Sequence, residues 1–360
     1  MVDPVSFLVL ILLATGLSHA AFAYDARNRL FWSCAPGVLL LFAVHPVALV
    51  FALASFALCG GVYVAGRCMG SSRINARLPY AILLLVFVPD AVGAFASDPI
   101  LMLGSAFFVV RQMMTVAAAL KERRAASDFV PGMLLATFFF AALPSGPVFN
   151  GLRIWEQLKA GRRPEYPEGL VRLFEGFVFL FAFGGIASVA IEYTGPVGAV
   201  LAERSNAAAL WSFRLLVEPL LGICLVFVTF YGYSRMAEGT ALLFGCEVPR
   251  NFDKPHLARD LADFWKRWHR SMADFVMQYI YLPLLVSTSR ARFAMLAAFV
   301  FMGMWHELTL GYLVWGLGHG VGLGVFLPWA RRRNVPAPVV RVFCLAYVVA
   351  LSAIARGIWT

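Results

Sequence analysis

Apolar stretches long enough to cross a lipid bilayer recur along almost the whole chain, and they constrain its fold more than any other feature. A hydrocarbon core about 30 Å thick is crossed by about 20 predominantly apolar helical residues. The runs fall at roughly 5–24, 31–66, 78–97, 99–119, 129–149, 170–194, 207–232, 275–288, 293–316, 317–330 and 337–355. Since 61% of the 360 residues are hydrophobic and only 14% are charged, a water-soluble globule is excluded. We therefore expect an integral membrane protein.

The pattern within these runs predicts helices and no strands. Backbone polar groups in lipid must be hydrogen-bonded within the protein, which leaves helices or closed barrels. A barrel would show segments of about 10 residues that alternate apolar and polar positions, and the chain does not show them. We predict an all-α fold, a single integral membrane domain over residues 1–360, with about 10 or 11 transmembrane or re-entrant helices.

Basic residues lie in the short segments between the runs and account for the net charge of +10. Such clusters are typical of cytoplasmic loops, so we expect a lipid bilayer and no nucleic acid as the partner of this charge. The cluster of Lys159, Arg162 and Arg163 would fall on the opposite side if every run crossed. Either one run enters and returns, around the His45-Pro46 pair or at the "PSGP" end of 129–149, or the number of crossing runs differs by one from this count.

The first apolar run and the cysteines carry little functional information. The sequence "HAAFA" resembles a signal cleavage site, but Asp3 stands where a signal peptide carries positive charge, which favours an uncleaved first helix. The six cysteines are scattered and form no C-x-x-C pair. We therefore predict neither a disulfide nor a cysteine-bound metal.

The stretch "FWKRWHRSM" at 264–272 places charges among tryptophans inside the longest polar interruption of the chain. A continuous helix over this stretch would put Lys266 and Arg270 on one face and Phe264 and Trp268 on another. Such a helix suits the membrane interface, with its aromatic side chains directed inward. His269 would lie at the edge of the aromatic face, where an interfacial helix does not require it.

A second unusual stretch is "FMGMWHELTLGYLVWGLGHGVGLG" at 301–324. His306 and Glu307 follow a long apolar run, and ionisable groups at such depth are typical of functional sites. A histidine hydrogen-bonded inside a helix bundle is the structural alternative. His319 accompanies a glycine stripe at 316, 320 and 324 that favours close helix packing. In one straight helix His306 and His319 would point roughly 140° apart, unless a break near Gly311 changes their directions.

Several chemistries are excluded by spacing. Leu310 stands where a zincin requires its second histidine, and His256 and His269 lack further ligands nearby, so we predict no metal site. Neither a phosphate-binding loop nor G-x-S-x-G is present. What remains is a histidine in an apolar enclosure beside tryptophan. Such an imidazole stays neutral and can act as a general base on a hydroxyl.

Several of these stretches resemble the membrane-bound O-acyltransferase family, in the bacterial branch that includes the D-alanyl transfer protein of teichoic acid synthesis and the alginate O-acetylation protein. The resemblance runs from about residue 100 to 325. It is carried by "NFDKPHLARDLADFWKRWHRSM", "YIYLPL" and "MGMWHELTLGYLVWGLGHG", with "GSAFFVVRQ", "PSGPV" and "FYGYSRMAEG" upstream. The order of the "FWKRWH" and "WHE" blocks, with 37 residues from His269 to His306, is its most specific part.

By this resemblance, His306 matches the catalytic histidine of the family and His269 matches its second polar site residue. His306 would deprotonate an acceptor hydroxyl, and His269 would orient a reactant or stabilise the oxyanion. We expect substrate contacts from Trp305, Trp268, Trp265, Glu307 and His319. We expect an anionic donor to dock on Lys266, Arg267 and Arg270.

The resemblance also implies a reaction, a location and partners. We expect transfer of a short acyl group, D-alanyl or acetyl, from a thioester to a hydroxyl of an extracytoplasmic glycan or teichoic-acid-like polymer. The donor would be a phosphopantetheine carrier protein or acyl-CoA on the cytoplasmic side of a bacterial inner membrane, with no permanently bound cofactor. Accessory envelope proteins are further expected partners.

Two departures from the family pattern concern single residues. The branch usually has W-H-G where this chain has Trp305-His306-Glu307, and an aspartate is common where Arg235 stands. We therefore carry over no role for Arg235.

Two rival functions remain open from the sequence. One is a proton-coupled transporter or flippase that uses Asp90, Glu175, Glu218, His306 and Glu307 as relay groups. These carboxylates can equally be structural partners of arginines, and the chain lacks the internal repeat of many transporters. The other rival is an inactive homologue that only scaffolds partners, against which the intact His269 and His306 argue.

Overall fold

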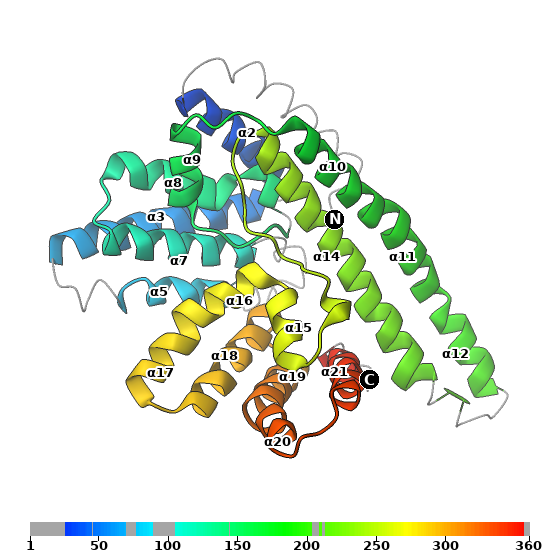
Figure 1. Ribbon diagram of the computed structural model, residues 1–360. Coiled ribbons are helices and arrows are strands. Elements are labelled where there is room, and N and C mark those ends of the chain that lie inside the picture. The colour runs from blue at the N-terminus through cyan, green and yellow to red at the C-terminus, as the bar shows by residue number, and fades with distance from the viewer. Residues whose placement is uncertain are drawn as a thin grey trace. The chain divides into compact units, whose positions relative to one another are not determined.

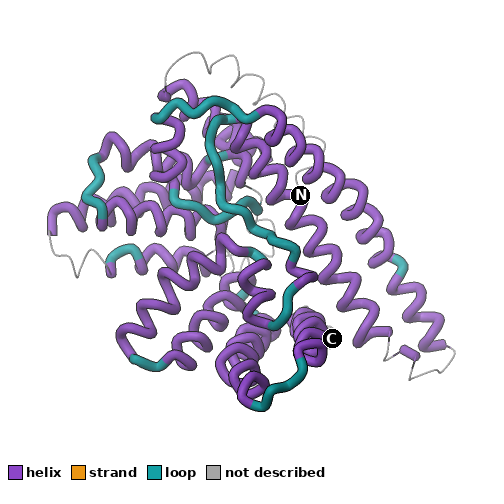
Figure 2. Tube along the Cα trace, viewed as in Figure 1, coloured by secondary structure: helices purple, strands orange, loops and turns teal. Residues whose placement is uncertain are grey.

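The computed structural model is predominantly helical in the residues that it describes, which are 26–44, 46–69, 77–88, 105–143, 145–203, 209–210 and 213–355. Helices joined by short loops account for this part of the chain, and it contains no strand (Figure 2). Because helices satisfy their own backbone hydrogen bonds, this architecture suits a chain so rich in apolar residues. The segment with the "HAAFA" sequence lies outside the described residues.

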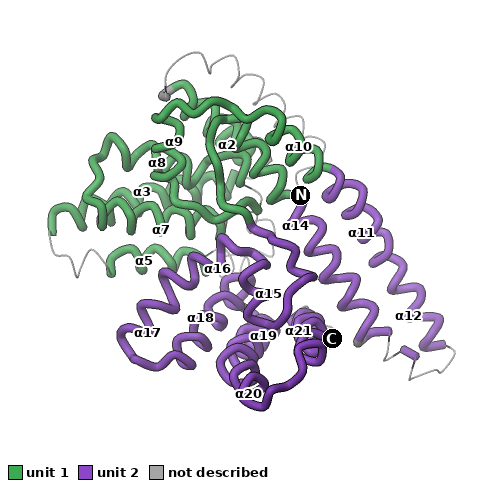
Figure 3. The backbone as a smooth tube through the Cα atoms, viewed as in Figure 1, with its two compact units in different colours: residues 1–177, 233–250 green, residues 178–232, 251–360 purple. Residues whose placement is uncertain are grey.

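The chain divides into two compact units (Figure 3). Unit 1 comprises Met1–Phe177 and Tyr233–Arg250, and unit 2 comprises Val178–Gly232 and Asn251–Thr360. The long polar interruption noted in the sequence begins in unit 1 and ends in unit 2. A single domain over residues 1–360 stays a prediction, because contact density alone does not show whether a unit folds independently.

Unit 1 packs short and long helices around a core of apolar side chains (Figure 1). Its elements are α2 (Ala26–Val44), α3 (Pro46–Met69), α5 (Tyr80–Leu83), η1 (Leu84–Phe87), α7 (Ser105–Lys121), α8 (Ala126–Phe138), η3 (Phe140–Ala142), α9 (Gly151–Lys159), α10 (Tyr166–Phe177) and the second part of α14 (Glu218–Leu243). A polar cluster lies within this core, where Gln112 donates hydrogen bonds to Ser55 (3.0 Å) and Thr137 (3.0 Å). Buried polar groups of this kind fix the register of neighbouring helices.

The apolar run at 129–149 includes most of α8, and the chain then turns back, so that α9 lies beside the residues that precede α8. Arg153 of α9 pairs with Glu122 at 3.2 Å, and Glu156 pairs with Arg124. Because Glu122 and Arg124 immediately precede α8, both ends of the run lie together. Thirteen residues of helix extend only about 20 Å, which is too short to cross a membrane. This geometry agrees with the re-entrant "PSGP" explanation expected from the charges.

Unit 2 contains the first part of α14 and the C-terminal helices (Figure 1). Its elements are η4 (Val178–Phe183), α11 (Gly184–Glu192), α12 (Thr194–Glu203), η5 (Phe213–Val217), η6 (Pro255–Leu257), α15 (Leu261–Arg267), α16 (Arg270–Val276), η7 (Met277–Tyr281), α17 (Leu282–Thr288), α18 (Ala291–His306), α19 (Leu310–Val321), η8 (Gly322–Phe326), α20 (Leu327–Arg332) and α21 (Ala337–Ala355). The pair formed by α18 and α19 is its most closely packed element pair.

Glycines permit the close approach of α18 and α19. A Cβ atom placed on Gly316 would lie 2.5 Å from the Phe299 carbonyl oxygen, and one on Gly303 would lie 2.3 Å from the Tyr312 carbonyl oxygen. A Cβ on Gly320 would lie 2.9 Å from Leu296 Cα. The predicted small-residue packing is therefore confirmed at Gly316 and Gly320. At Gly324 the nearest atom to such a Cβ is 3.9 Å away, so this position tolerates a methyl group in ordinary van der Waals contact.

Membrane crossing is supported by helix length and composition. Among the described residues, five helical segments are long and apolar enough to cross, and they are Pro46–Met69, Tyr166–Glu203, Glu218–Leu243, Leu310–Arg332 and Ala337–Ala355. Three shorter apolar helices are Asn28–Ala43, Ala126–Phe138 and Ala291–His306. The predicted all-α, multi-pass membrane fold is confirmed. The count of ten or eleven helices stays a prediction, since parts of several runs lie outside the described residues.

We predict that Gly316→Ala destabilises the protein whereas Gly324→Ala does not. The first change forces a methyl group against the backbone of α18 and should cost about 1–3 kcal/mol. The second places its methyl group in ordinary van der Waals contact and should stay within about 0.5 kcal/mol of wild type. Thermal unfolding of the detergent-solubilised variants measures both. Equal losses would contradict the packing described here.

Candidate active site

His306 is the last residue of α18 and is an exposed residue at the point where the chain reverses. Glu307 takes an extended conformation, and the Thr309 side chain then accepts a hydrogen bond from the Tyr312 backbone N–H (3.4 Å) to cap α19. The His306 ring stacks on Tyr312 with centroids 5.4 Å apart. An edge contact with Trp305 at 4.8 Å holds its other side. The helix end therefore presents an imidazole in a defined orientation.

His269 lies at a break between α15 and α16, which corrects the expectation of one continuous helix over 264–272. Its backbone is left-handed, with φ +45° and ψ +51°. A non-glycine residue in this region carries strain, and such strain occurs often at functional sites. Lys266 is exposed and Phe264 is buried, as expected, but Arg270 begins the next helix and so does not share a helix face with Lys266.

Asn251 holds the break in place from a distant part of the chain. Its carbonyl oxygen accepts a hydrogen bond from the Arg270 N–H at 2.9 Å. Its side-chain oxygen accepts a second from the Ser271 hydroxyl at 2.5 Å. Trp268 packs on Phe264 with stacked rings 5.5 Å apart and meets the edge of Phe252 at 5.2 Å. These contacts offset the strain at His269. They also give its ring a direction different from the one that it would have in a continuous helix.

His319 lies on α19 and is completely buried. Trp265 Nε1–H donates a hydrogen bond to His319 Nδ1 at 3.4 Å, which places the proton of the neutral ring on Nε2. Trp315 meets the same ring at 4.5 Å and also the His306 ring at 5.8 Å. The helix break at residues 307–309 removes the straight helix that would have separated the two histidines. His319 therefore fixes the positions of Trp265 and Trp315.

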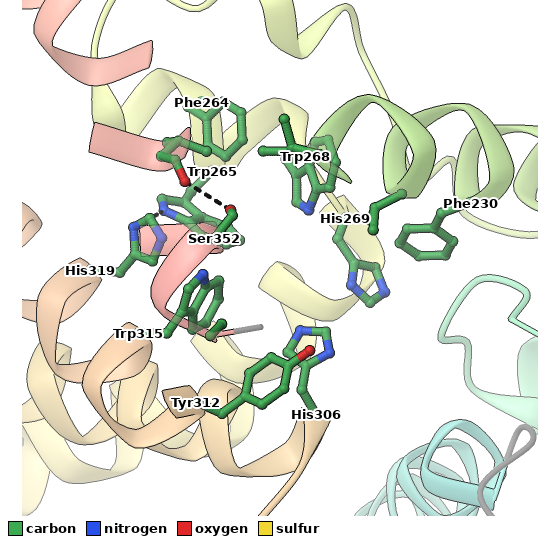
Figure 4. A pocket seen from close by; sticks show the side chains of 14 residues that line it. Phe230, Phe264, Trp265, Trp268, His269, His306, Tyr312, Trp315, His319 and Ser352 are labelled. Atoms are coloured by element: carbon green, nitrogen blue, oxygen red, sulfur yellow. Dashed lines mark hydrogen bonds between the residues drawn. The ribbon is translucent and has the colours of Figure 1, made fainter. Parts of the chain in front are cut away.

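One cavity of about 130 Å³ brings these side chains together within unit 2 (Figure 4). Most of its walls are rings, and the remainder are small or aliphatic side chains. The ring-bearing residues are Phe230, Phe264, Trp265, Trp268, His269, His306, Tyr312, Trp315 and His319. The others are Ile223, Val226, Val348, Ser352 and Ala355. Residues from α14, α15, the turn at Trp268 and His269, α18, α19 and α21 thus line a single site.

The cavity includes half of the predicted site residues. His306, His269, Trp268, Trp265 and His319 line it. Trp305 does not line the cavity and instead packs behind it, 5.9 Å from the His269 ring centroid. Glu307 is exposed beside His306 and is not part of the described lining either.

The sequence reasoning missed several cavity residues. Tyr312 and Trp315 share one face of α19 with His319, and this helical spacing was available in the sequence. Phe230 on α14 and Ser352 on α21 join the site only through tertiary packing, so no local pattern identifies them.

The basic residues predicted to dock a donor have different surroundings. Lys266 is exposed. Arg267 is engaged within the chain, since it pairs with Asp263 at 3.1 Å and donates to the Asp253 carbonyl at 3.1 Å. Arg270 is half-buried. Lys266 is therefore the most accessible of the three for an external anion.

The electrostatic environment of the cavity disfavours positive charge. Its described lining contains no lysine, arginine, aspartate or glutamate. His269 lies outside the membrane-spanning helices, and burial, with a smaller contribution from the neighbouring His306 ring, holds the pKa of His269 well below its ordinary value. The His269 ring is consequently neutral near pH 7. Among the described residues, no group of three or more His, Cys, Asp or Glu side chains is arranged to hold a metal ion.

The fold and the site thus indicate a multi-pass membrane protein that is helical in its described residues and has a cavity lined by histidines. The model of the membrane-bound O-acyltransferase family matches residues 202–353, which include every residue lining this cavity except Ala355. This match agrees with the resemblance to the membrane-bound O-acyltransferase family noted in the sequence.

Curated relatives carry names of envelope-modifying enzymes. The chain is 31% identical to a teichoic acid D-alanyltransferase of Streptococcus thermophilus over 38% of this chain and 37% of that protein. It is 34% identical to a peptidoglycan O-acetyltransferase of Helicobacter pylori over 54% of this chain and 37% of that protein. It is 22% identical to a protein of Pseudomonas fluorescens named "Probable alginate O-acetylase AlgI" over 73% of this chain and 54% of that protein. The matches span about a third to a half of the length of these relatives.

We predict that Asn251→Leu destabilises the turn at His269. The change removes the buried hydrogen bond between Asn251 and the Ser271 hydroxyl, and the loss of such a bond costs about 0.5–1.5 kcal/mol. Thermal unfolding of the solubilised protein measures the loss.

The double variant Asn251→Leu/Ser271→Ala provides the control. It removes both partners of this hydrogen bond and should recover part of the stability. An additive loss in the double variant would show that the two side chains do not act together.

Proposed function

We propose that this protein is an integral membrane O-acyltransferase that moves a short acyl group from a thioester to a hydroxyl group. The observation that carries the proposal is the exposed residue His306 on the wall of an aromatic cavity, with His269 on the same wall. The family match over this segment supports the assignment. The names of the relatives, which transfer D-alanyl or acetyl groups, support the acyl class.

His306 acts as the general base in the proposed reaction. Its neutral imidazole takes the proton of the acceptor hydroxyl as that oxygen attacks the thioester carbonyl carbon. The carbon–sulfur bond then breaks, and the departing thiolate receives the proton, so an ester and a free thiol are formed. Both substrates bind together in this scheme, and no covalent enzyme intermediate is needed. The stacking of His306 on Tyr312 keeps the base in position.

His269 stabilises the charge that develops on the carbonyl oxygen or orients one reactant. A neutral imidazole offers one N–H donor, and the lowered pKa of His269 keeps it in that state. The left-handed turn held by Asn251 directs this ring into the cavity. Trp265 and Trp268 exclude water from the reacting atoms, while Trp305 and Glu307 flank His306 and influence its orientation.

The donor and acceptor follow from the same proposal. We expect the thioester to arrive on the cytoplasmic side from acyl-CoA or a phosphopantetheine carrier protein, with the exposed Lys266 as the first contact and Arg267 and Arg270 beside it. The acceptor is a hydroxyl of an extracytoplasmic glycan or teichoic-acid-like polymer. These substrates place the protein in a bacterial inner membrane, where accessory envelope proteins deliver the acceptor.

We predict that His306→Ala lowers acyl transfer by about 10²–10⁴-fold, the usual contribution of a general base. His269→Ala should cause a smaller loss, because orientation or one hydrogen bond contributes less than proton removal. The assay follows labelled acyl groups from acyl-CoA and from carrier-protein thioesters into glycan, with purified full-length protein.

His256→Ala is the matched control, because His256 is exposed on η6 and does not line the cavity. It should retain wild-type activity. Wild-type activity of His306→Ala, at normal expression and melting temperature, would overturn the mechanism. If the wild-type protein moved a solute across the membrane in response to a proton gradient, the transporter function would be favoured instead.

A further inference from the structure

The cavity offers rings and aliphatic groups but no negative charge to a bound acyl group. Among its described lining residues the polar side chains are the three histidines, Tyr312, Ser352 and the tryptophans. The Ser352 hydroxyl already donates to the Val348 carbonyl at 2.8 Å. Glu307, the carboxylate nearest in sequence to His306, is not part of this lining. An ammonium group placed here would find no carboxylate partner in the described walls.

We propose that the acyl group received by this cavity is short and uncharged, of the acetyl type, and that an amino-acyl group such as D-alanyl is disfavoured. This inference rests on the proposed function, and it selects between the two acyl classes that the family resemblance leaves open.

The charge argument compares two opposing free energies. Removing an ammonium ion from water carries a large desolvation cost when no counter-ion compensates. Cation–π contacts with the aromatic walls return only part of that cost. The cost is therefore larger than the return. The same burial lowers the pKa of His269 in this wall. A site that disfavours imidazolium disfavours an alkylammonium for the same reason.

The size of the cavity limits the acyl chain. Its volume is about 130 Å³, and an apolar protein cavity of about 150 Å³ holds one benzene molecule, which has about six heavy atoms. Acetyl and butyryl groups fit this space, and an octanoyl group exceeds it. The side chains of this wall resist displacement by a larger group, because Trp265 is hydrogen-bonded to the buried His319 and Trp315 packs on the His319 ring. Small acyl groups are therefore favoured by shape as well as by charge.

The test uses two pantetheine thioesters of equal shape. Isobutyryl and D-alanyl groups differ only by a methyl group in place of the ammonium group. With the full-length protein at pH 6.5, we expect kcat/KM for isobutyryl-pantetheine to exceed that for D-alanyl-pantetheine at least about tenfold, the ratio that corresponds to 1.4 kcal/mol. Acetyl-pantetheine should be used well, and octanoyl-pantetheine poorly. Equal or better use of D-alanyl would overturn the inference while leaving the acyltransferase assignment intact.

The pH dependence of this ratio gives a second measurement. An α-amino group has a pKa of about 8, so raising the pH from 6.5 to 8.5 removes the charge from most of the D-alanyl substrate. The D-alanyl to isobutyryl ratio should then rise. The titratable groups that face the cavity are His269, His306, His319 and Tyr312. Their own titration affects both substrates and cancels in the ratio, so a ratio independent of pH would contradict the charge argument.

A substitution in the wall tests the missing counter-charge directly. Ser352→Asp adds a carboxylate to the cavity and should shift the preference at least tenfold toward D-alanyl, whereas the uncharged, similarly shaped Ser352→Asn should not. Should the aspartate variant fail to fold, the wild-type substrate pair still decides the question.

Binding separates this inference from the proposed function. Ketone analogues of the two thioesters, with CH₂ in place of sulfur, are added to the protein in increasing amounts. Their binding is measured by the change in tryptophan fluorescence. Tighter binding of the isobutyryl analogue without any transfer would remove the acyltransferase proposal but support the cavity preference. Equal binding, tighter D-alanyl binding, or no binding of either analogue would overturn the preference.

Discussion

The left-handed turn at His269, held by Asn251, is the constraint on which the rest of the site depends. Helices are the default in a chain this apolar, because backbone groups in lipid must bond within the segment. An uninterrupted helix through Trp268 would leave Ser271 and Arg270 without their contacts to Asn251. The hydrogen bonds to Asn251 offset the free-energy cost of breaking the helix. The break places the His269 ring in the cavity.

A second interruption, at residues 307–309, completes the arrangement. It ends α18 at His306 and allows α19 to pack back along α18 through Gly303 and Gly316. The close packing of this hairpin stacks Tyr312 on His306. The position of the His306 ring thus depends on the glycine packing, since His306 and Tyr312 stack only when the backbones of α18 and α19 approach closely. The charge-free walls that result then select what the cavity can hold.

Local sequence patterns predicted the helical membrane fold, the glycine packing at Gly316 and Gly320, and the importance of the histidines. These follow from hydropathy, residue size and the cost of ionisable groups in lipid, all of which act locally. The continuous helix over 264–272 was wrong because helical periodicity does not register a tertiary partner such as Asn251. Substrate contact by Glu307 stays a prediction, although the described cavity walls do not include this residue.

The sequence by itself determined that this protein is all-helical, lies in a membrane and carries histidines where apolar surroundings keep imidazole neutral. Composition and short-range spacing suffice for these properties. Only the tertiary structure decided that His269, His306 and His319 share one cavity, that His319 fixes the position of Trp265, and that Phe230 and Ser352 complete the walls. These relations join helices far apart in the chain, and they arise from packing and hydrogen bonds that no local pattern encodes.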